Sequence, residues 1–461
     1  MELFTVLFMA LTTIPRDLKM TYDTAETMTR VNYWSWKDRT VFQLFDEVVK
    51  HQKYNIAFRR GFDTWSFHMV QEYSFKIASY FHLAGLQRGD VVGLAGVEGP
   101  QSVALWLGIS RLGAVTALLP SDLAPADMVQ AASKVYSKAI ICTPELATGL
   151  TQQKLPNYMS ILSLGPTQDK SVKNIIREVD GSSSKPLKHN MSVNNKLLYL
   201  FSPKTLIPRP VTHYRYIYIA TNIRKSLDFT AKDIIYSPMP QSTADGSIVA
   251  AGQTILFGNL VVSGGKPTID TYFKDCDHYG ATIAMYDAEI VKGLMASSST
   301  EMDKHHKVRL LTGNGLQNPQ TWTELKERFN IHHIGQYHII VDSDGRNLVN
   351  SYGKPGAIGF VPWYFSGQKV KLVALDPNTG EVVRKQNRLC KSPAKDQPGI
   401  LIEEMPKDFV RVQFSKNKKV ISDVYRKGDK YINTGEILKK DEKGYYYYMG
   451  QIEDFKVKTQ S

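Results

Sequence analysis

The segment from Gly89 to Leu119 constrains the fold more than any other part of the chain. It contains two short apolar runs separated by a turn and a helix-like stretch; in order, these parts are Val91–Leu94, Gly96–Pro100, Ser102–Leu112 and Ala114–Leu119. Two strands joined by a helix within about 30 residues form a β-α-β unit. Arg111 and Gly113 interrupt the apolar stretch, which argues against a membrane span. The chain is therefore predicted to be an α/β protein.

Apolar periodicity and turn residues predict further elements on both sides of this unit. Helices are expected at Thr40–His51, Met69–Leu83 and Thr321–Phe329. Strands are expected at Ile56–Phe58 paired with Gly61–Phe67, at Asp233–Tyr236 and at Thr254–Val262. Hairpins are expected at 369–384 and 437–448, where tyrosines 445–448 would alternate between two faces of a strand.

Composition and charge narrow the class of partner. The 461 residues are 43% apolar and 22% charged, which is typical of globular domains, and the net charge is +13. A basic chain suits nucleic acid, an anionic membrane or an anionic nucleotide, but the chain has no arginine-rich run and no nucleic-acid motif, so nucleic acid is not expected. The three cysteines are too far apart for a disulfide framework or a zinc site, which favours a reducing cytosolic compartment.

The N-terminus carries an apolar run, Leu3–Ile14, followed by Pro15–Lys19 with two basic residues. The run is shorter than the roughly 18 residues that a bilayer span requires. It also lacks the basic start and the small-residue cleavage site of a signal peptide. We expect an interfacial membrane anchor, with a helix docked on the core as the alternative.

Changes in composition predict five segments along the chain. Residues 1–37 form the membrane-associating segment and a joint, and 38–180 form a first α/β lobe. A Gly-Ser-rich linker begins at Gly181, so 181–355 form a second α/β lobe that contains the nucleotide loop. Residues 356–450 form a β-rich subdomain, and 451–461 form a truncated hinge.

A loop that lacks its expected glycines is the main functional signal. Residues 198–216 read LYLFSPKTLIPRPVTHYRY, and this frame resembles that of the adenylate-forming acyl-CoA synthetases, whose pattern is close to YTSGTTGLPK. In such loops glycine lets backbone N–H groups approach phosphate oxygens, often at positive φ. Pro203 and Leu206 stand where the pattern has glycine, and Lys204 replaces a threonine. The matching positions are Ser202, Thr205, Pro208 and Arg209.

Further stretches resemble, more narrowly, the fatty acid transport proteins, which are also very-long-chain acyl-CoA synthetases. They are LQRGDVV at 86–92, VALWLGISRLGAVTALL at 103–119, GQTILFG at 252–258 and LTGNGL at 311–316, and the resemblance covers nearly the whole chain. It implies the large adenylate-forming N-terminal body, with two α/β lobes and a small β-rich subdomain. It also implies a membrane-attached enzyme that joins a fatty acid to AMP, using ATP and Mg²⁺, and then transfers the acyl group to coenzyme A.

The resemblance assigns roles to individual residues. Thr205 and Asp342 are the candidates for catalysis, and Asp342 is also the candidate Mg²⁺ ligand. His338 stands where the family has the tyrosine that stacks on adenine, and Glu436 where an aspartate accepts from the ribose hydroxyls. The residues implied to bind the cofactor are Ser202, Lys204, Thr205, Arg209, His338, Asp342, Glu436 and Asp454.

The sequence departs from the family pattern at each of these loops. Thr243 replaces a histidine on the acyl side, and Gln451 replaces the hinge-side arginine. Ile339 and Ile340 replace glycine and alanine where the nucleotide must lie close to backbone. His213 occupies the position of a histidine that follows the phosphate loop in the family, and structural and functional roles are equally compatible with it.

These departures predict a diverged member of the family. The chain also stops at Ser461, before the mobile C-terminal domain whose lysine contacts the α-phosphate in the family. Losing such positioning groups is expected to leave weak or no acyl-CoA synthesis, and no bound cofactor in the extreme case. The alternatives are an active long-chain or very-long-chain fatty acid–CoA ligase that uses Lys204 and Arg209 to hold phosphate, and a gene model that lacks its last exons.

The same resemblance sets expectations for partners and location. The expected partners are a long-chain fatty acid or acyl-CoA, a membrane surface, and a related synthetase in a homo- or hetero-oligomer. The expected location is the cytosolic face of the endoplasmic reticulum or plasma membrane.

Overall fold

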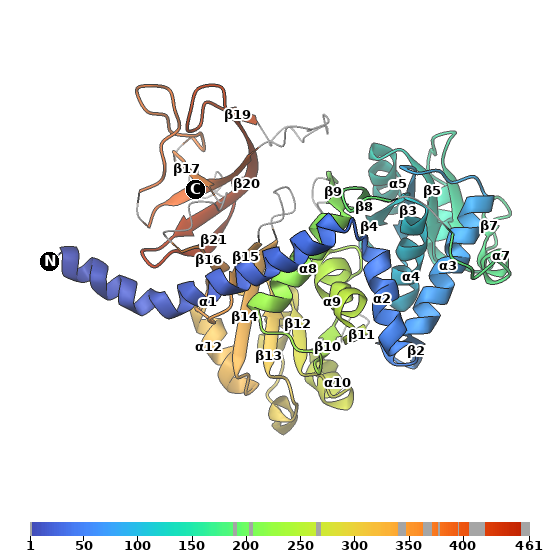
Figure 1. Ribbon diagram of the computed structural model, residues 1–461, viewed down its shortest axis with the longest axis horizontal. Helices are drawn as coiled ribbons and strands as arrows, with labels where there is room; N and C mark the ends of the chain where they lie inside the picture. Colours follow the sequence, from blue (N-terminus) through green and yellow to red (C-terminus); the bar gives the residue numbers. More distant parts are fainter. Residues whose placement is uncertain are drawn as a thin grey trace. The chain divides into compact units, whose positions relative to one another are not determined.

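The computed structural model of the chain describes residues 2–187, 191–201, 206–263, 269–339, 347–362, 371–376, 379–394, 396–404 and 420–452 (Figure 1); for residues 2–11 and 404 it describes the backbone alone. Contacts divide the chain into two compact units. The larger unit comprises Glu26–Tyr286 and Ala296–Leu311, and the smaller unit comprises Met1–Ala25, Asp287–Met295 and Thr312–Ser461.

The larger unit contains a seven-stranded sheet with the order β7-β6-β5-β3-β4-β8-β9. Its neighbouring strands are parallel, except that β8 and β9 are antiparallel. The strands are β3 (Val91–Ala95), β4 (Val115–Leu119), β5 (Ser137–Cys142), β6 (Ser160–Ser163), β7 (Lys173–Asn174), β8 (Lys196–Phe201) and β9 (Pro208–Thr212). β3 and β4 pair in parallel through the helix α4 (Gly99–Arg111), so the predicted β-α-β unit is confirmed.

Close helix packing covers this sheet. Gly108 of α4 lies against α3 (Phe67–Leu83), where an added Cβ would be 2.6 Å from Ile77 and from the carbonyl of Ser74. Arg111 is buried, and Asp46 accepts two hydrogen bonds from its guanidinium, at 2.7 and 2.9 Å. This pairing explains how a charged residue is accommodated within an apolar run.

A second group of strands in the larger unit has the order β12-β10-β11-β1-β2, with only β1 and β2 antiparallel. The strands are β1 (Ile56–Arg60), β2 (Asp63–Ser66), β10 (Ile234–Ser237), β11 (Leu260–Ser263) and β12 (Ile283–Tyr286). The predicted hairpin at 56–67 and the strand at 233–236 are therefore confirmed.

The predicted strand at Thr254–Val262 is wrong in its first half. Residues Ala251–Phe257 form the helix α9, and only Leu260–Ser263 form a strand. Gly258, with a φ of +78°, ends the helix in the left-handed conformation. A short apolar run has no periodicity that distinguishes a buried helix from a strand, which is why the sequence misled here.

The remaining elements of the larger unit surround these sheets. The helices are α2 (Val41–Gln52), α5 (Pro125–Lys134), α6 (Pro144–Thr151), α7 (Ile176–Asp180), α8 (His213–Ser226) and α10 (Tyr272–His278), with a π-helix at Asp245–Ala250 and 3₁₀ turns at Ile269–Thr271 and Glu301–Lys304. The helices predicted at 40–51 and 69–83 are confirmed as α2 and α3.

The N-terminal helix α1 runs from Glu2 to Trp36. Within the smaller unit, the guanidinium of Arg16 lies over the rings of Phe360 and Tyr445 at 4.2 and 4.6 Å and donates to the carbonyl of Lys443. Within the larger unit, Thr27 and Val31 are buried. Part of α1 after the apolar run is thus docked on protein. The side chains of residues 2–11 lie outside the described residues, so the membrane anchor and the docked helix both stay predictions for that run. In the part of the chain that the structure describes, no helix has both the length and the apolar character needed to cross a membrane.

The smaller unit is rich in strands. One sheet has the order β16-β21-β20-β18-β17, with β19 paired to β20. Its strands are β16 (Gly359–Phe360), β17 (Lys371–Ala374), β18 (Pro398–Glu404), β19 (Val420–Ser422), β20 (Lys430–Lys440) and β21 (Tyr445–Gln451). β14 (His333–Ile339) and β15 (Asn347–Asn350) form an antiparallel pair, and the other elements are β13 (Leu310–Gly313), α11 (Ala288–Ala296) and α12 (Pro319–Arg328).

The predicted hairpin at 437–448 and the helix at 321–329 are confirmed by β20–β21 and α12. The tyrosines of β21 alternate as expected. Tyr445 and Tyr447 pack with Phe360, while Tyr446 and Tyr448 pack with Leu401 and Leu438.

Candidate nucleotide-binding site

The structure describes three of the eight residues predicted to bind the nucleotide. Arg209 lies on β9 in the larger unit, and His338 and Glu436 lie on β14 and β20 in the smaller unit. The other five, Ser202, Lys204, Thr205, Asp342 and Asp454, lie outside the described residues.

The strands beside the predicted phosphate loop are well defined. β8 and β9 pair antiparallel, with Leu200 opposite Arg209 and Phe201 opposite Pro208. The Thr212 side chain then accepts from the N–H of Arg215 and starts α8. Arg209 is thus held on a paired strand immediately before a helix N-terminus.

Leu206 keeps a glycine-like backbone at the end of this loop. Its φ is +51°, in the left-handed region where glycine is favoured, and the family pattern has glycine at this position. The side chain is buried with Val129 and Phe201 in the core beneath the first sheet. The Lys134 ammonium donates to the Leu206 carbonyl at 3.2 Å. Packing therefore holds a leucine in a conformation that costs a non-glycine residue about 1 kcal/mol.

The predicted adenine and ribose residues are bonded to each other. His338 Nε2 and Glu436 Oε2 are 2.9 Å apart, and both side chains are about four-fifths buried, at 19% and 21% exposure. The backbone presents Glu436 through Gly435, whose φ is +79°, and the Glu436 N–H donates to Thr434 Oγ1. The ring and the carboxylate that were predicted to contact adenine and ribose are therefore bonded to one another.

Two neighbours complete this polar cluster. Gln451 lies opposite Glu436 in the β20–β21 register, and its amide donates to the Tyr448 hydroxyl at 2.8 Å. The Tyr448 ring is 6.2 Å from the His338 ring. We call His338, Glu436, Tyr448 and Gln451 the His338 cluster. Among these four side chains there is no guanidinium to meet a phosphate, since glutamine occupies the position of the family's arginine.

Thr243 stands at the position where the family pattern has a histidine, and its side chain forms hydrogen bonds with the backbone. Its hydroxyl donates to the Pro240 carbonyl at 2.8 Å and accepts from the Gly246 N–H at 3.2 Å. The π-helix Asp245–Ala250 follows directly and continues into α9. Gly246 is required there, because an added Cβ would lie 2.2 Å from the Pro240 carbonyl oxygen. The sequence analysis missed this π-helix, a feature that occurs frequently at functional sites.

Besides the π-helix, the sequence analysis missed the residue Glu98. Its carboxylate accepts from the Gln241 N–H at 2.8 Å, which joins the turn after β3 to the start of the Thr243 segment. Burial raises the pKa of Glu98, and the Gln241 N–H and the charge of Arg60 partly offset that rise. The sequence signal that could have indicated Glu98 is an acidic residue between Gly96 and Gly99, in the turn after a buried strand.

His213 has a structural role. Its Nδ1 accepts from the N–H of Val41, at the start of α2, and its ring packs edge-on against Phe42. The side chain is buried, and this burial lowers its pKa to about 3, so the ring is neutral. These contacts support the structural role among the two left open for this residue.

No group of three His, Cys, Asp or Glu side chains arranged to hold a metal ion occurs among the residues that the structure describes. The predicted Mg²⁺ ligand, Asp342, lies outside them.

Comparisons with known proteins show which families the chain is similar to. Residues 45–204 match the family model of the AMP-binding enzymes. Long-chain fatty acid transport protein 1 of Bos taurus is 27% identical over 442 residues, which cover 90% of this chain and 67% of the relative.

Solved structures of CoA ligases share the fold. A benzoate CoA ligase from Burkholderia xenovorans has a TM-score of 0.73 at 14% identity, covering 90% of this chain and 80% of the ligase. The anthranilate CoA ligase AuaEII in complex with anthranoyl-AMP has a TM-score of 0.74 at 14% identity, covering 90% and 78%. The chain therefore has the α/β fold of the adenylate-forming CoA ligases, and its sequence is similar to those of the AMP-binding enzymes and the long-chain fatty acid transport proteins.

Proposed function

We propose that the protein handles long-chain fatty acid or acyl-CoA at a membrane surface, with weak or no ATP-dependent acyl-CoA synthesis. The observation that carries this proposal is the pairing of His338 with Glu436 at 2.9 Å. The relatives are named for long-chain fatty acid transport, which supplies the class of ligand.

The pair opposes nucleotide binding by competition. A hydrogen bond to a charged group contributes about 1.5–3 kcal/mol, and each 1.4 kcal/mol changes an equilibrium constant about tenfold. A ribose that needs the Glu436 carboxylate must first break its contact with His338. This competition is expected to weaken nucleotide binding by one to two orders of magnitude.

The phosphate side of the site points the same way. Leu206 keeps the left-handed backbone with its side chain in the core, whereas Pro203 has no N–H to donate. Gln451 offers an amide where a cation would stabilise developing negative charge. When bound, Mg²⁺ would offset phosphate charge, with Asp342 as its expected ligand, and coenzyme A would be the acyl acceptor.

A working ligase is the second candidate. Arg209 is fixed on β9 at the position where a basic residue follows the loop, and Lys204 would add a second cation. In that case the two side chains hold phosphate in place of backbone N–H groups. A complex with a related synthetase is a third arrangement, in which the partner supplies the chemistry and this chain supplies fatty acid.

Attachment to a membrane rests on the apolar run Leu3–Ile14 and on the net charge of +13. The docked turns of α1 leave the start of that run as the segment that would enter the interface. The cytosolic face of the endoplasmic reticulum or plasma membrane is the proposed location.

The test is acyl-CoA formation by the purified full chain with ATP, Mg²⁺, coenzyme A and labelled palmitate. We expect a rate equal to that of heat-denatured protein, while a parallel assay detects palmitate binding to the folded chain. A rate well above the control that is lost in Arg209→Ala supports the ligase instead.

A further inference from the structure

A polar cavity of about 260 Å³ lies in the larger unit between α1 and α8. Its walls are the turn of α1 around Thr27 and Arg30, the last turns of α8, the loop that follows them and Phe257 at the end of α9. Figure 1 shows these later turns of α1 running across α8. At about 30 Å³ per water molecule, the volume equals roughly nine waters, so a small organic ligand fits.

Arg224 brings a largely buried guanidinium to this cavity. It donates to two neutral acceptors, Gln253 Oε1 at 3.2 Å and Asn259 Oδ1 at 2.7 Å, and lies 4.5 Å from the centre of the Phe257 ring. Among the described side chains, no carboxylate lies within ion-pair distance of it. Burial, together with the positive charge of Arg30, lowers the pKa of Arg224 to about 10, although the charge of Asp233 acts in the opposite direction. The guanidinium is thus oriented by its neighbours and lacks a close counter-charge.

The other charged groups leave the cavity positive. Glu26 is 2.6 Å from the Lys225 ammonium but 3.8 Å from the guanidinium of Arg30. Asp228 is exposed and is the only other carboxylate among the lining residues. Three cations and two carboxylates therefore surround the space, and an anion improves its charge balance.

Two buried hydroxyl groups that have no partner in the described part of the chain lie in the cavity wall, and their oxygen atoms are closed off from the cavity itself. Thr27 and Thr221 line the cavity, are 1% and 4% exposed, and their Oγ1 atoms have no hydrogen-bond partner among the described residues. A buried hydroxyl without a partner costs about 1–3 kcal/mol. A threonine in a helix commonly bonds to the carbonyl one turn earlier, which neither of these does.

We propose that this cavity binds the phosphate group of a small phosphate ester. Arg224 and Arg30, one from each helix, hold the phosphate oxygens. Guanidinium groups match phosphate geometry with two parallel hydrogen bonds. Donors from both helices outnumber the two oxygens of a carboxylate, which favours phosphate over a carboxylic acid.

The cavity is separate from the predicted phosphate loop. The loop leads into His213 at the start of α8, and Arg224 lies eleven residues later, in the last turns of that helix. At 1.5 Å per residue, this separation is about 16 Å along the helix. The proposal therefore does not rest on the proposed function, and each can fail without the other.

The test is titration calorimetry of glycerol 3-phosphate into the full chain in phosphate-free buffer. We expect one saturable site, with affinity at least tenfold lower in Arg224→Gln and in Arg30→Gln. Thr27→Val and Thr221→Val change the cavity wall but no group that reaches the ligand, so they should leave binding unchanged. They conserve volume and remove an unbonded hydroxyl, so their melting temperatures should not fall. Arg30 is exposed, so Arg30→Gln keeps the test valid if Arg224→Gln does not fold.

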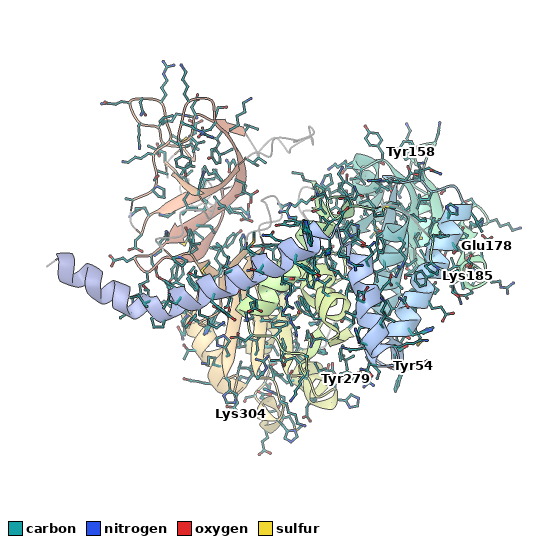
Figure 2. All side chains as sticks on the ribbon, viewed as in Figure 1. Tyr54, Tyr158, Glu178, Lys185, Tyr279 and Lys304 are labelled. Atoms are coloured by element: carbon teal, nitrogen blue, oxygen red, sulfur yellow. The ribbon has the colours of Figure 1, made fainter. Side chains whose placement is uncertain are left out.

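Lys185→Gln is the matched control, because Lys185 is exposed and lies well away from α8 (Figure 2). Flotation with phosphatidylcholine vesicles, with or without phosphatidic acid, identifies the source of the phosphate. Flotation that requires phosphatidic acid and is lost in Arg30→Gln assigns a lipid headgroup, whereas saturable heat without flotation assigns a soluble ester. The proposal is overturned if neither occurs, or if Lys185→Gln loses binding as much as Arg30→Gln.

Discussion

Leu206 and His213 show, residue by residue, what the sequence could and could not predict. The sequence placed Leu206 at a glycine position, but only the structure shows that the backbone keeps a φ of +51° and that the core holds the side chain. It placed His213 after the loop, but not against the Val41 N–H, because that contact joins residues 172 apart in the chain. Local patterns report backbone preference, and they do not report partners that folding brings from elsewhere.

The buried His213 makes stability depend on pH. Its pKa in the folded chain, about 3, lies below the ordinary value of 6.5. Between these two pH values the unfolded chain therefore binds a proton at His213 and the folded chain does not. Its effect on stability is absent above pH 6.5, and stability falls as the pH drops toward 3, by up to about 1.4 kcal/mol per pH unit. Urea unfolding from pH 7.5 to 4.5 should show a smaller slope for His213→Asn, which retains an acceptor. An equal slope in both proteins would contradict the buried, neutral ring.

At Leu206 we expect the glycine variant to be more stable than the alanine variant, which is the reverse of the usual order in a strand. Leu206→Ala loses packing, about 2–5 kcal/mol, and keeps the left-handed strain. Leu206→Gly loses the same packing but relieves that strain, so it should be about 1 kcal/mol more stable than the alanine variant. At Leu200, on the regular strand β8, glycine should be worse than alanine. Thermal unfolding of the four variants measures both differences, and the same order at both sites would argue against the left-handed backbone.

At the scale of elements, predictions held where periodicity was long or turn residues were clear. β3, α4 and β4 appear where expected, because fully buried parallel strands read as continuous apolar runs. The apolar stretch 254–262 failed because a helix and a strand meet at Gly258 within it. The π-helix at 245–250 carries no periodic signal that distinguishes it from an ordinary helix.

The contact of α3 with α4 depends on one missing side chain. Gly108→Ala would place a Cβ 2.6 Å from the Ser74 carbonyl and from Ile77, so the helices must separate. Overpacking of this kind costs about 1–3 kcal/mol. Gly181→Ala is the control, because Gly181 has a φ of −78° and its nearest neighbour, the Arg177 carbonyl, is 3.3 Å from an added Cβ. Urea unfolding should show a clear loss for Gly108→Ala and little change for Gly181→Ala.

For the molecule as a whole, the sequence identified the family and the positions that depart from its pattern. It could not show that the side chains at two of those positions contact each other. His338 and Glu436 are 98 residues apart, and the strands β14 and β20 bring them within hydrogen-bond distance. A histidine in place of tyrosine and a glutamate in place of aspartate each look mild alone. Together they make a contact that, in the proposed account, a nucleotide would have to break.

Titration calorimetry of Mg·ATP is the most direct test of this account. We predict no saturable binding at micromolar concentrations for the natural chain, and at least tenfold tighter binding for His338→Tyr combined with Glu436→Asp, since this removes the His338–Glu436 contact and restores the residue types of the family pattern at both positions. His332→Tyr, the same change at an exposed histidine, should behave like the natural chain. Micromolar Mg·ATP affinity in the natural chain, left unchanged by the double substitution, would contradict the central claim that the His338–Glu436 pair opposes nucleotide binding.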